Sequence, residues 1–273
     1  MNTLVKLPLN VLLTKRCNVA CKFCVEETKI KTPDLLNHKD FAKRVNTLIA
    51  EGKVSDVLLL GGEPLYFKGI LELIQALDIP PIITTNGSRL VQDPAFLKAI
   101  TKLKVRGFNI SLPHYSEKQR LRLMGKLPAT NAQLKEVIRE LPFKVRVNSI
   151  LLKNYIDSLT EVQMMAYFCK SIGAKELKMA EVTARNPLYH DFIQDDVVAF
   201  NQAHHIPIPD VPCRQECHTK GGTAWFGEIN GVQVYFNAPP EKIDKDKPWF
   251  RVLFNDGALG YTWRREDGVS FAE

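Results

Sequence analysis

Half of the chain's six cysteines stand together in the segment RCNVACKFC, residues 16–24, as Cys17, Cys21 and Cys24. The C-x3-C-x2-C spacing offers three thiolates, which suits three corners of an iron–sulfur cube and leaves the fourth iron open to an exogenous ligand. Zinc is the alternative, but zinc sites usually pair C-x2-C with a second C-x2-C or H-x3-H, and no such pair follows nearby. A disulfide framework fits poorly, because such frameworks belong to short secreted chains. The spacing favours a cluster and leaves zinc open.

The composition is that of an ordinary globular protein, with 45% hydrophobic and 25% charged residues. Its start shows no apolar run followed by a small-residue cleavage site, and stretches such as Val57–Leu60 are too short to cross a bilayer. We therefore expect a cytoplasmic protein without membrane contact. The formal net charge of +7 weakly favours an anionic substrate or nucleotide, and nucleic-acid binding is the less favoured interpretation.

Apolar runs alternate with amphipathic segments over the first two thirds of the chain, which predicts six βα-type units and a parallel sheet wrapped by helices. Active sites in such folds form at the carboxyl ends of the strands. The cysteine segment, GGEP (61–64), TTNG (84–87) and NSI (148–150) all lie at or near these ends. We expect strands at 8–14, 54–60, 80–87, 107–112, 143–152 and 175–182, and helices at 38–52, 67–77, 94–104, 131–142 and 159–173.

The C-terminal part of the chain has a different pattern. Residues 223–240 alternate around Asn230-Gly231 and residues 249–267 around Asp256-Gly257, which are strong signals for two-residue hairpin turns. This predicts a small antiparallel β appendage. Because the stretch before it is rich in proline, we place a core domain at 1–206 and the extension at 207–273.

Five motifs occur in a fixed order within residues 7–185: CNVACKFC, GGEP, TTNG, NISL and VRVNSIL. Together, on a βα repeat, they make the chain similar to the radical S-adenosylmethionine (radical SAM) superfamily. The pattern is closest to the branch with the molybdenum-cofactor GTP cyclases and the viperin-like enzymes. The resemblance implies an α/β fold with a partial (β/α)6 barrel, an oxygen-sensitive [4Fe–4S] cluster on Cys17, Cys21 and Cys24, and SAM at the open iron.

The resemblance also implies a set of SAM-binding residues. Phe23 corresponds to an aromatic near the adenine, and Glu63 is suited to accept a charge-assisted hydrogen bond from the SAM ammonium. Packing of the loop explains Phe23 equally well, and an ordinary turn or cap explains any single polar residue of the set. The full set is Phe23, Gly61, Gly62, Glu63, Pro64, Asn86, Ser111 and Asn148.

Several residues with chemical potential stay outside these motifs. The segment SLPHY carries Pro113 and His114 where many relatives have Ser-Leu-Asp, and we interpret His114 as a surface residue rather than a substrate contact or proton donor. Lys178 and Glu181 alternate with apolar residues on the last predicted strand of the core, so they face either a pocket or a half-buried surface.

The remaining thiols have no clear partner. Cys213, Cys217 and His218 form C-x3-C-H at the predicted domain boundary, while Cys169 lies on the apolar face of a predicted helix. A second cluster needs three or four cysteines, so we favour a pair of pocket or structural residues and leave the second cluster open. In the extension, Arg264 and Arg265 either bind an anionic group or are solvated.

The leading hypothesis is an enzyme that cleaves SAM to a 5′-deoxyadenosyl radical, which abstracts hydrogen from a small, anionic or nucleotide-like substrate. Such an enzyme needs an electron donor, such as a flavodoxin or a ferredoxin. The alternatives are an activating enzyme that installs a glycyl radical on a partner protein, and a peptide-modifying maturase. A non-catalytic iron–sulfur or zinc scaffold would need the cysteines but neither GGEP nor the polar residues at the strand ends.

Overall fold

The computed structural model describes residues 6–25, 34–182, 195–209, 215–219, 222–238, 248–263, 265 and 268–270. Within these ranges the strands are β1 (Leu7–Leu12), β2 (Val54–Leu60), β3 (Ile82–Thr85), β4 (Gly107–Ser111), β5 (Lys144–Leu151), β6 (Glu176–Glu181), β7 (Gln215–Thr219), β8 (Gly222–Ile229), β9 (Val232–Ala238), β10 (Arg251–Leu253), β11 (Ala258–Gly260) and β12 (Val269–Ser270). The helices are α1 (His38–Ala50), the 3-10 turn η1 (Pro64–Tyr66), α2 (Ile70–Ala76), α3 (Ser88–Gln92), α4 (Pro94–Ile100), α5 (Glu117–Met124), α6 (Asn131–Glu140), α7 (Leu159–Ile172) and α8 (Asp195–His204).

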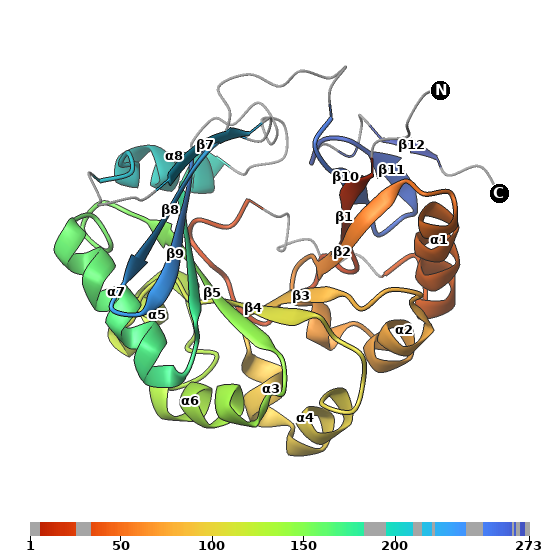
Figure 1. Cartoon of the computed structure of the whole chain (residues 1–273), viewed down its shortest axis with the longest axis horizontal. Helices are drawn as coiled ribbons and strands as arrows, with labels where there is room; N and C mark the ends of the chain where they lie inside the picture. Colours follow the sequence, from red (N-terminus) through yellow and green to blue (C-terminus); the bar gives the residue numbers. More distant parts are fainter. Residues whose placement is uncertain are drawn as a thin grey trace.

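All the described strands join one sheet, in the order β12-β11-β10-β1-β2-β3-β4-β5-β6-β9-β8-β7. Strands β1 to β6 are mutually parallel, and the sheet curves into an arc with helices on its outer side (Figure 1). The predicted α/β class, with a parallel sheet, covering helices and a C-terminal antiparallel β region, is confirmed. No helix in the described part of the chain is long and apolar enough to cross a membrane.

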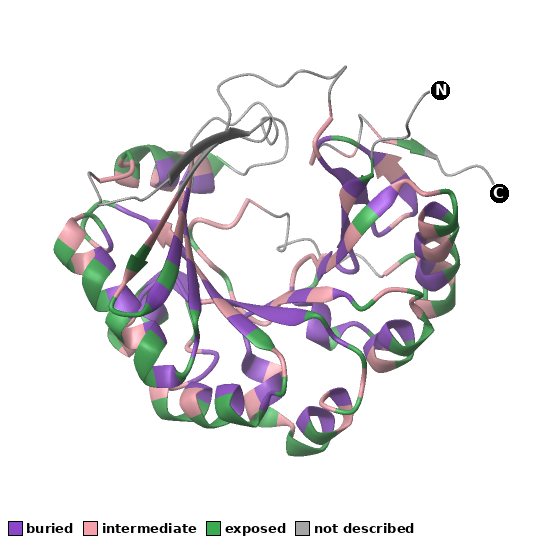
Figure 2. Ribbon diagram, in the orientation of Figure 1, coloured by how far each residue is buried: buried purple, intermediate pink, exposed green. Residues whose placement is uncertain are grey.

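The side chains of the sheet separate into an outer apolar layer and an inner layer that faces the hollow of the arc. On β5, Val145, Val147 and Leu151 are buried, while the alternate positions are half-buried or exposed. The buried side chains pack with residues of α1 and α6, such as Phe41, into the main hydrophobic core. In Figure 2 the buried residues lie along the strands and on the sides of the helices that face the sheet. The side chains of the inner layer are not part of this core and are available to line pockets.

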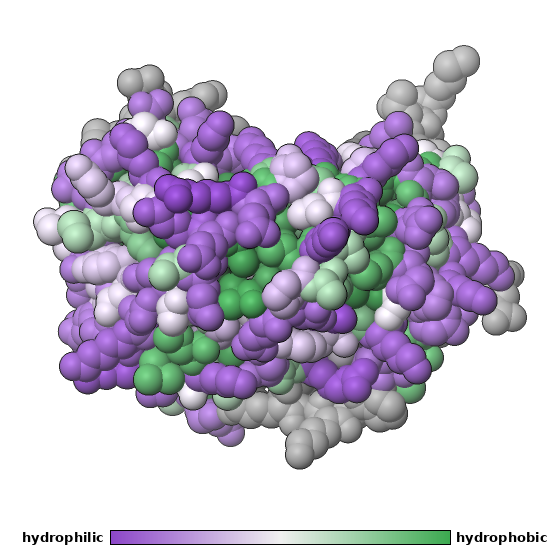
Figure 3. Space-filling model, turned by 90° about the horizontal axis from the view of Figure 1, so that it is seen from below, coloured by the Kyte–Doolittle hydropathy of each residue, from purple (hydrophilic) through white to green (hydrophobic). Residues whose placement is uncertain are grey.

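The helices begin where the sequence supplies caps. Asn37 caps α1 and Thr130 caps α6, and in both helices the third residue returns the bond to the cap backbone, which forms a capping box. The face of the molecule seen from the side of α4 and α6 is mainly hydrophilic. Hydrophobic residues gather near the centre of this face (Figure 3). Three helices, α3, α5 and α8, were not predicted, because they are short or carry little apolar periodicity.

The C-terminal strands attach differently from the prediction of a single appendage. The antiparallel strands β7–β9 continue the sheet beyond β6, with β9 parallel to β6, whereas β10–β12 continue it beyond β1, with β10 parallel to β1. The physical reason is that each edge of a parallel sheet presents unpaired backbone groups, which an added strand satisfies. The division into domains at residues 206 and 207 stays a prediction.

Candidate active site

The cysteine loop follows β1 and is fixed to the end of α5. Ala20 donates its backbone N–H to the carbonyl of Met124 over 2.9 Å, and Lys22 donates to Leu123 over 2.9 Å. Cys17, Cys21 and Cys24 are partly exposed and form no disulfide, and the Cys24 N–H closes a turn on the Cys21 carbonyl over 3.2 Å. The loop thus presents three thiols on a backbone that is tied to its surroundings.

The three thiols interact with one another electrostatically. Burial raises the pKa of Cys21 far above its ordinary value, and the neighbouring Cys24 and Cys17 raise it further. Burial also raises the pKa of Cys17, although hydrogen bonds from the backbone and from the Asn86 side chain oppose this. A bound metal opposes these effects, because a thiol that coordinates a metal is deprotonated.

The GGEP segment lies directly beside the start of the cysteine loop. The Gly62 N–H donates to the Thr14 carbonyl over 2.7 Å, and the Glu63 N–H donates to the Arg16 carbonyl over 2.8 Å. A Cβ atom on Gly61 would lie 2.5 Å from the Thr14 oxygen, and one on Gly62 would lie 2.2 Å from the Arg16 oxygen. Both glycines are therefore required for the close approach of these two segments, whatever ligand they also accommodate.

Glu63 is almost fully buried and joins GGEP to the end of β3. Its carboxylate accepts hydrogen bonds from the Leu65 N–H over 3.1 Å, the Thr85 hydroxyl over 2.5 Å and the Asn86 N–H over 2.7 Å. Burial raises its pKa from 4.5 to about 7, while these donors act in the opposite direction. The contact between Glu63 and the SAM ammonium stays a prediction. The ammonium has to bind to carboxylate lone pairs that are not already used by these three donors.

Asn86 fixes the TTNG turn to the cysteine loop. Its Nδ2 donates to the Asn18 Oδ1 over 2.8 Å, and the Asn18 Nδ2 donates to the Ser88 hydroxyl over 2.9 Å. Asn86 was predicted from the sequence, whereas Asn18, Thr85 and Ser88 were not. The only signal for Asn18 was its place within the cysteine motif, because the hydrogen bonds that define its role come from residues far away in the sequence.

A pocket of about 220 Å³ opens at the carboxyl ends of β4, β5 and β6. The register of the sheet sets Ser111 beside Asn148 and Asn148 beside Lys178, and Phe23 reaches the same pocket from the cysteine loop. The predicted residues Phe23, Ser111 and Asn148 are thus brought together. The lining comprises Phe23, Ser111, Leu112, Pro113, Asn148, Ser149, Ile150, Lys178 and Ala180.

Comparison with known proteins agrees with this arrangement. The family described as the radical SAM superfamily matches residues 11–158, which hold the cysteine loop, GGEP and the strands up to β5. The chain belongs to the radical SAM superfamily. A GTP 3′,8-cyclase of Aquifex aeolicus is 32% identical over 180 residues, which cover 61% of this chain and 54% of that protein. The chain therefore spans about half the length of this relative.

Solved structures of radical SAM proteins share the fold. SuiB of Streptococcus suis bound to the precursor peptide SuiA has a TM-score of 0.62 at 17% identity, with 94% of this chain and 59% of that chain covered. SuiB bound to S-adenosylmethionine has a TM-score of 0.54 at 24% identity, with 66% of this chain and 40% of that chain covered. At these identities the likeness extends to the fold.

Radical SAM enzymes carry a [4Fe–4S] cluster and SAM, and the donor set of this chain fits the cluster. Its three cysteines form no disulfide, interact electrostatically and belong to one loop that is tied to α5. Among the described residues, no three His, Cys, Asp or Glu side chains are grouped to hold a single metal ion. Single-ion coordination needs sulfurs about 3.8 Å apart around zinc, whereas in a cube each thiolate binds a different iron.

Lys178 is the cation of the carboxyl-end pocket. Burial and, as the second cause, the positive charge of Arg146 lower its pKa from 10.5 to about 8. Its ammonium therefore gains from an anionic partner in the pocket. Of the two positions predicted for Lys178, the one in a pocket is confirmed. The Glu181 carboxylate instead accepts a hydrogen bond from the Ile208 N–H over 2.9 Å and ties β6 to the segment after α8.

The prediction that His114 lies on the surface is wrong. Its side chain is 4% exposed, its ring packs 4.3 Å from the ring of Tyr115, and its Nδ1 accepts from the Ser116 N–H over 2.9 Å. Burial lowers its pKa to about 4, with the Arg120 charge as a second cause. The histidine follows β4 at the buried junction with α5 and α7, a contact that the local sequence SLPHY does not reveal.

Other predicted residues are structural or lie outside the description. Cys169 is buried in α7, as predicted, and burial raises the pKa of its thiol to about 12. Arg265, which follows β11, pairs with Asp256 of the turn between β10 and β11. Cys213 and Arg264 lie outside the described residues, as do the side chains of Cys217 and His218 on β7.

Proposed function

We propose that this radical SAM enzyme abstracts hydrogen from a small, anionic or nucleotide-like substrate that binds at the carboxyl-end pocket. The observation that carries the proposal is that Phe23 of the cysteine loop and Lys178 of β6 line the same pocket. A substrate whose anionic group pairs with Lys178 therefore lies next to the loop that holds the cluster. The GTP 3′,8-cyclase relatives support a nucleotide-like substrate.

In this proposal Cys17, Cys21 and Cys24 hold the cluster. When bound, the cluster supplies the electron that cleaves SAM and yields the 5′-deoxyadenosyl radical. The other residues position SAM and shield the site from water and dioxygen. Glu63 orients the SAM ammonium, Phe23 packs near the adenine, and the ribose or carboxylate of SAM contacts Asn86, Ser111 and Asn148.

The residues also set the charge of the site. Lys178 of β6 places a proton and a positive charge in the pocket, where it stabilises an anionic group of the substrate. Strands β7–β9 and β10–β12, at the two edges of the arc, narrow its open side and limit the access of water and dioxygen. A flavodoxin or a ferredoxin serves as the electron donor.

Anaerobic reconstitution followed by incubation with SAM and a reductant tests the proposal. We expect about four irons and four sulfides per chain and the release of 5′-deoxyadenosine. Deuterated nucleotides are then offered in place of unlabelled ones, and deuterium in the 5′-deoxyadenosine identifies the substrate. Protein-dependent incorporation of deuterium from a labelled peptide, and none from any nucleotide, would instead favour the activase or maturase alternatives.

A further inference from the structure

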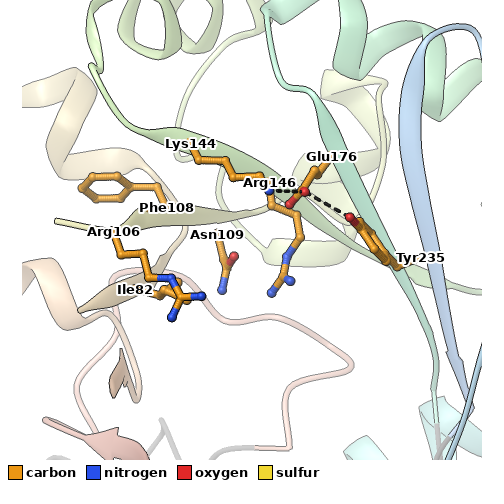
Figure 4. A pocket seen from close by; sticks show the side chains of 9 residues that line it. Ile82, Arg106, Phe108, Asn109, Lys144, Arg146, Glu176 and Tyr235 are labelled. Atoms are coloured by element: carbon orange, nitrogen blue, oxygen red, sulfur yellow. Dashed lines mark hydrogen bonds and ion pairs between the residues drawn. The ribbon is translucent and has the colours of Figure 1, made fainter. Parts of the chain in front are cut away.

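A second cavity, of about 280 Å³, opens at the amino ends of β3 to β6 (Figure 4). It shares no lining residue with the carboxyl-end pocket. Neither the cysteine loop nor any of the predicted SAM-binding residues reaches it. The lining comprises Ile82, Arg106, Gly107, Phe108, Asn109, Lys144, Arg146, Glu176 and Tyr235.

The sheet register gathers the polar groups of this cavity. Lys144 and Arg146 are two positions apart on β5 and therefore project to the same face. Arg146 lies between Asn109 of β4 and Glu176 of β6 in the register. In Figure 4 the side chains of Arg106, Asn109 and Arg146 extend to the same side of the sheet, with Asn109 between the two guanidinium groups.

The charges of the cavity do not balance. Lys144 pairs with Glu176 over 2.5 Å, and Tyr235 donates to the same carboxylate over 3.0 Å. Arg106 pairs with Asp56. Arg146 has no such partner: its only hydrogen bond within the described part of the chain runs from Nε to the neutral Asn148 Oδ1 over 3.1 Å. Neither Nη group has a hydrogen-bond acceptor among the described residues, so both are available to a ligand.

Burial adds to this imbalance. It lowers the pKa of Arg146, and the Glu176 and Tyr235 side chains counteract only part of that effect. Removing a guanidinium from water is costly unless an anion and hydrogen-bond acceptors replace the solvent. The planar fork of arginine matches two oxygens of a carboxylate or a phosphate.

We propose that the amino-end cavity is an oxyanion site, in which Arg146 binds a phosphate or carboxylate group through its two Nη atoms. Arg106 and the Asn109 side chain border the bound group. A metal cation is disfavoured by three cationic side chains, and an apolar ligand would leave the guanidinium unpaired.

Two sources supply such a group: the far end of the enzyme's own substrate, or a free small anion. The first source rests on the proposed function. The two pockets are neighbours, because a hydrogen bond joins Arg146 of the amino-end cavity to Asn148 of the carboxyl-end pocket. Residues two apart on one strand are separated by about 6.6–6.8 Å. One extended molecule that carries two anionic groups can therefore place one of them at Lys178 and the other at Arg146.

The test uses inorganic phosphate and the full chain without cluster or SAM, with the dissociation constant measured by isothermal titration calorimetry. Arg146→Gln is expected to weaken phosphate binding at least about tenfold, as the loss of a charge-assisted bidentate contact implies. The matched control is Arg139→Gln, which removes the same charge from an exposed position on α6 and leaves the affinity unchanged. An equal affinity in Arg146→Gln, or an equal loss in Arg139→Gln, would overturn the proposal.

A second variant guards against misfolding of the first. Arg106 has a largely exposed side chain, so Arg106→Gln preserves the fold, and we expect it to weaken phosphate binding severalfold. Circular dichroism confirms the folded state of each variant. If neither Arg146→Gln nor Arg106→Gln changes the phosphate affinity while both are folded, the site does not exist. Because no SAM cleavage enters this measurement, its failure is distinct from failure of the proposed function.

The source is identified with a matched pair of ligands, guanosine monophosphate and guanosine, which differ only in the phosphate. If the oxyanion belongs to the substrate, the monophosphate binds more tightly than guanosine, Arg146→Gln removes the difference, and inorganic phosphate competes with the monophosphate. If a free anion is bound instead, both ligands are insensitive to inorganic phosphate, which still binds in an Arg146-dependent manner. Both results support the oxyanion site.

Discussion

The inner face of the barrel has two halves that are built in opposite ways. At the β1 edge, Leu12, Phe250, Val252, Phe254 and Ala258 form a hydrophobic cluster, which we call the apolar half. At β4 to β6 and β9, the inner positions hold Asn109, Arg146, Asn148, Lys178 and Tyr235, which we call the polar half. Both halves belong to the same sheet.

The difference separates stability from binding. The apolar half fills its space with its own side chains, so it buries hydrophobic area and closes one edge of the arc. The polar half places two cations, Arg146 and Lys178, where burial disfavours their charged forms. Such positions weaken the fold unless a ligand compensates them, which is why we assign binding to the polar half.

The largest effect is expected at the cysteine loop, which reaches the polar half through Phe23. Cys21→Ala removes one of three cluster ligands, so we expect loss of the cluster absorbance and of 5′-deoxyadenosine formation. The matched control is Cys169→Ala, in the core of α7, which keeps the cluster and costs only about 1 kcal/mol of unfolding free energy. A Cys21→Ala protein with a full complement of iron would contradict the assignment.

The next effect concerns the apolar half. Phe254→Ala removes a side chain that is 4% exposed and leaves a cavity, so we expect the unfolding free energy to fall by about 3–5 kcal/mol. Chemical denaturation measures it, with Leu121→Ala, at an exposed position of α5, as the control below about 0.5 kcal/mol. We expect the folded Phe254→Ala variant to bind phosphate with unchanged affinity, because the apolar half contributes to stability and not to binding. A weakened phosphate affinity would contradict this division between the two halves.

Glu63 should make stability depend on pH. Its pKa of about 7 in the folded protein lies above the ordinary 4.5, so the folded state holds a proton that the unfolded chain has lost between these values. The stabilisation is fully present below pH 4.5 and is lost as pH rises through 7. From pH 5 to pH 8 we expect a loss of about 2–3 kcal/mol in unfolding free energy through this group.

The Glu63→Gln variant tests this dependence, because it cannot ionise. Its unfolding free energy should lack this loss between pH 5 and pH 8, whereas Glu140→Gln, exposed on α6, should follow the unmodified protein. Parallel pH profiles of Glu63→Gln and the unmodified protein would mean that Glu63 titrates as an ordinary carboxyl.

Lys178 should control the affinity of the polar half for anions. With a pKa of about 8, it is charged below that pH and neutral above it, so the affinity for a nucleotide should decrease as pH rises from 7 to 9.5. Lys178→Met should weaken binding about tenfold at pH 7 and remove this pH dependence. The control is Lys175→Gln, an exposed change of the same charge. A nucleotide affinity that is insensitive to Lys178→Met would place the substrate elsewhere.

The smallest effect is expected at Arg265, which the sequence offered as a candidate for an anionic group. Arg265 follows β11 and pairs with Asp256 of the turn between β10 and β11, and its side chain is 42% exposed. Arg265→Gln should therefore change the unfolding free energy by less than about 1 kcal/mol and leave nucleotide affinity unchanged. A tenfold loss of affinity would show that the apolar half also takes part in binding.

The sequence predicted what local patterns encode. Strand and helix alternation, the cysteine motif and the polar strand ends all depend on short segments, and the structure brings Phe23, Ser111 and Asn148 into one pocket. The roles of Asn18 and His114 depend instead on residues that are distant in the sequence: Asn18 donates to Ser88, and the ring of His114 packs near that of Tyr155. The unpaired charge of Arg146 was also invisible, because it results from how neighbouring strands pair their own charges.

The pairing of β1 with β10 has a consequence for synthesis of the chain. Strand β1 is made first, yet its second hydrogen-bonding edge stays open until Arg251–Leu253 has left the ribosome. During that interval an apolar strand with free N–H and C=O groups is available to other chains, which is the condition for edge-to-edge aggregation. A polypeptide cut at residue 206 retains that open edge permanently. Production of the isolated core therefore calls for a covering strand supplied in trans or fused to the end.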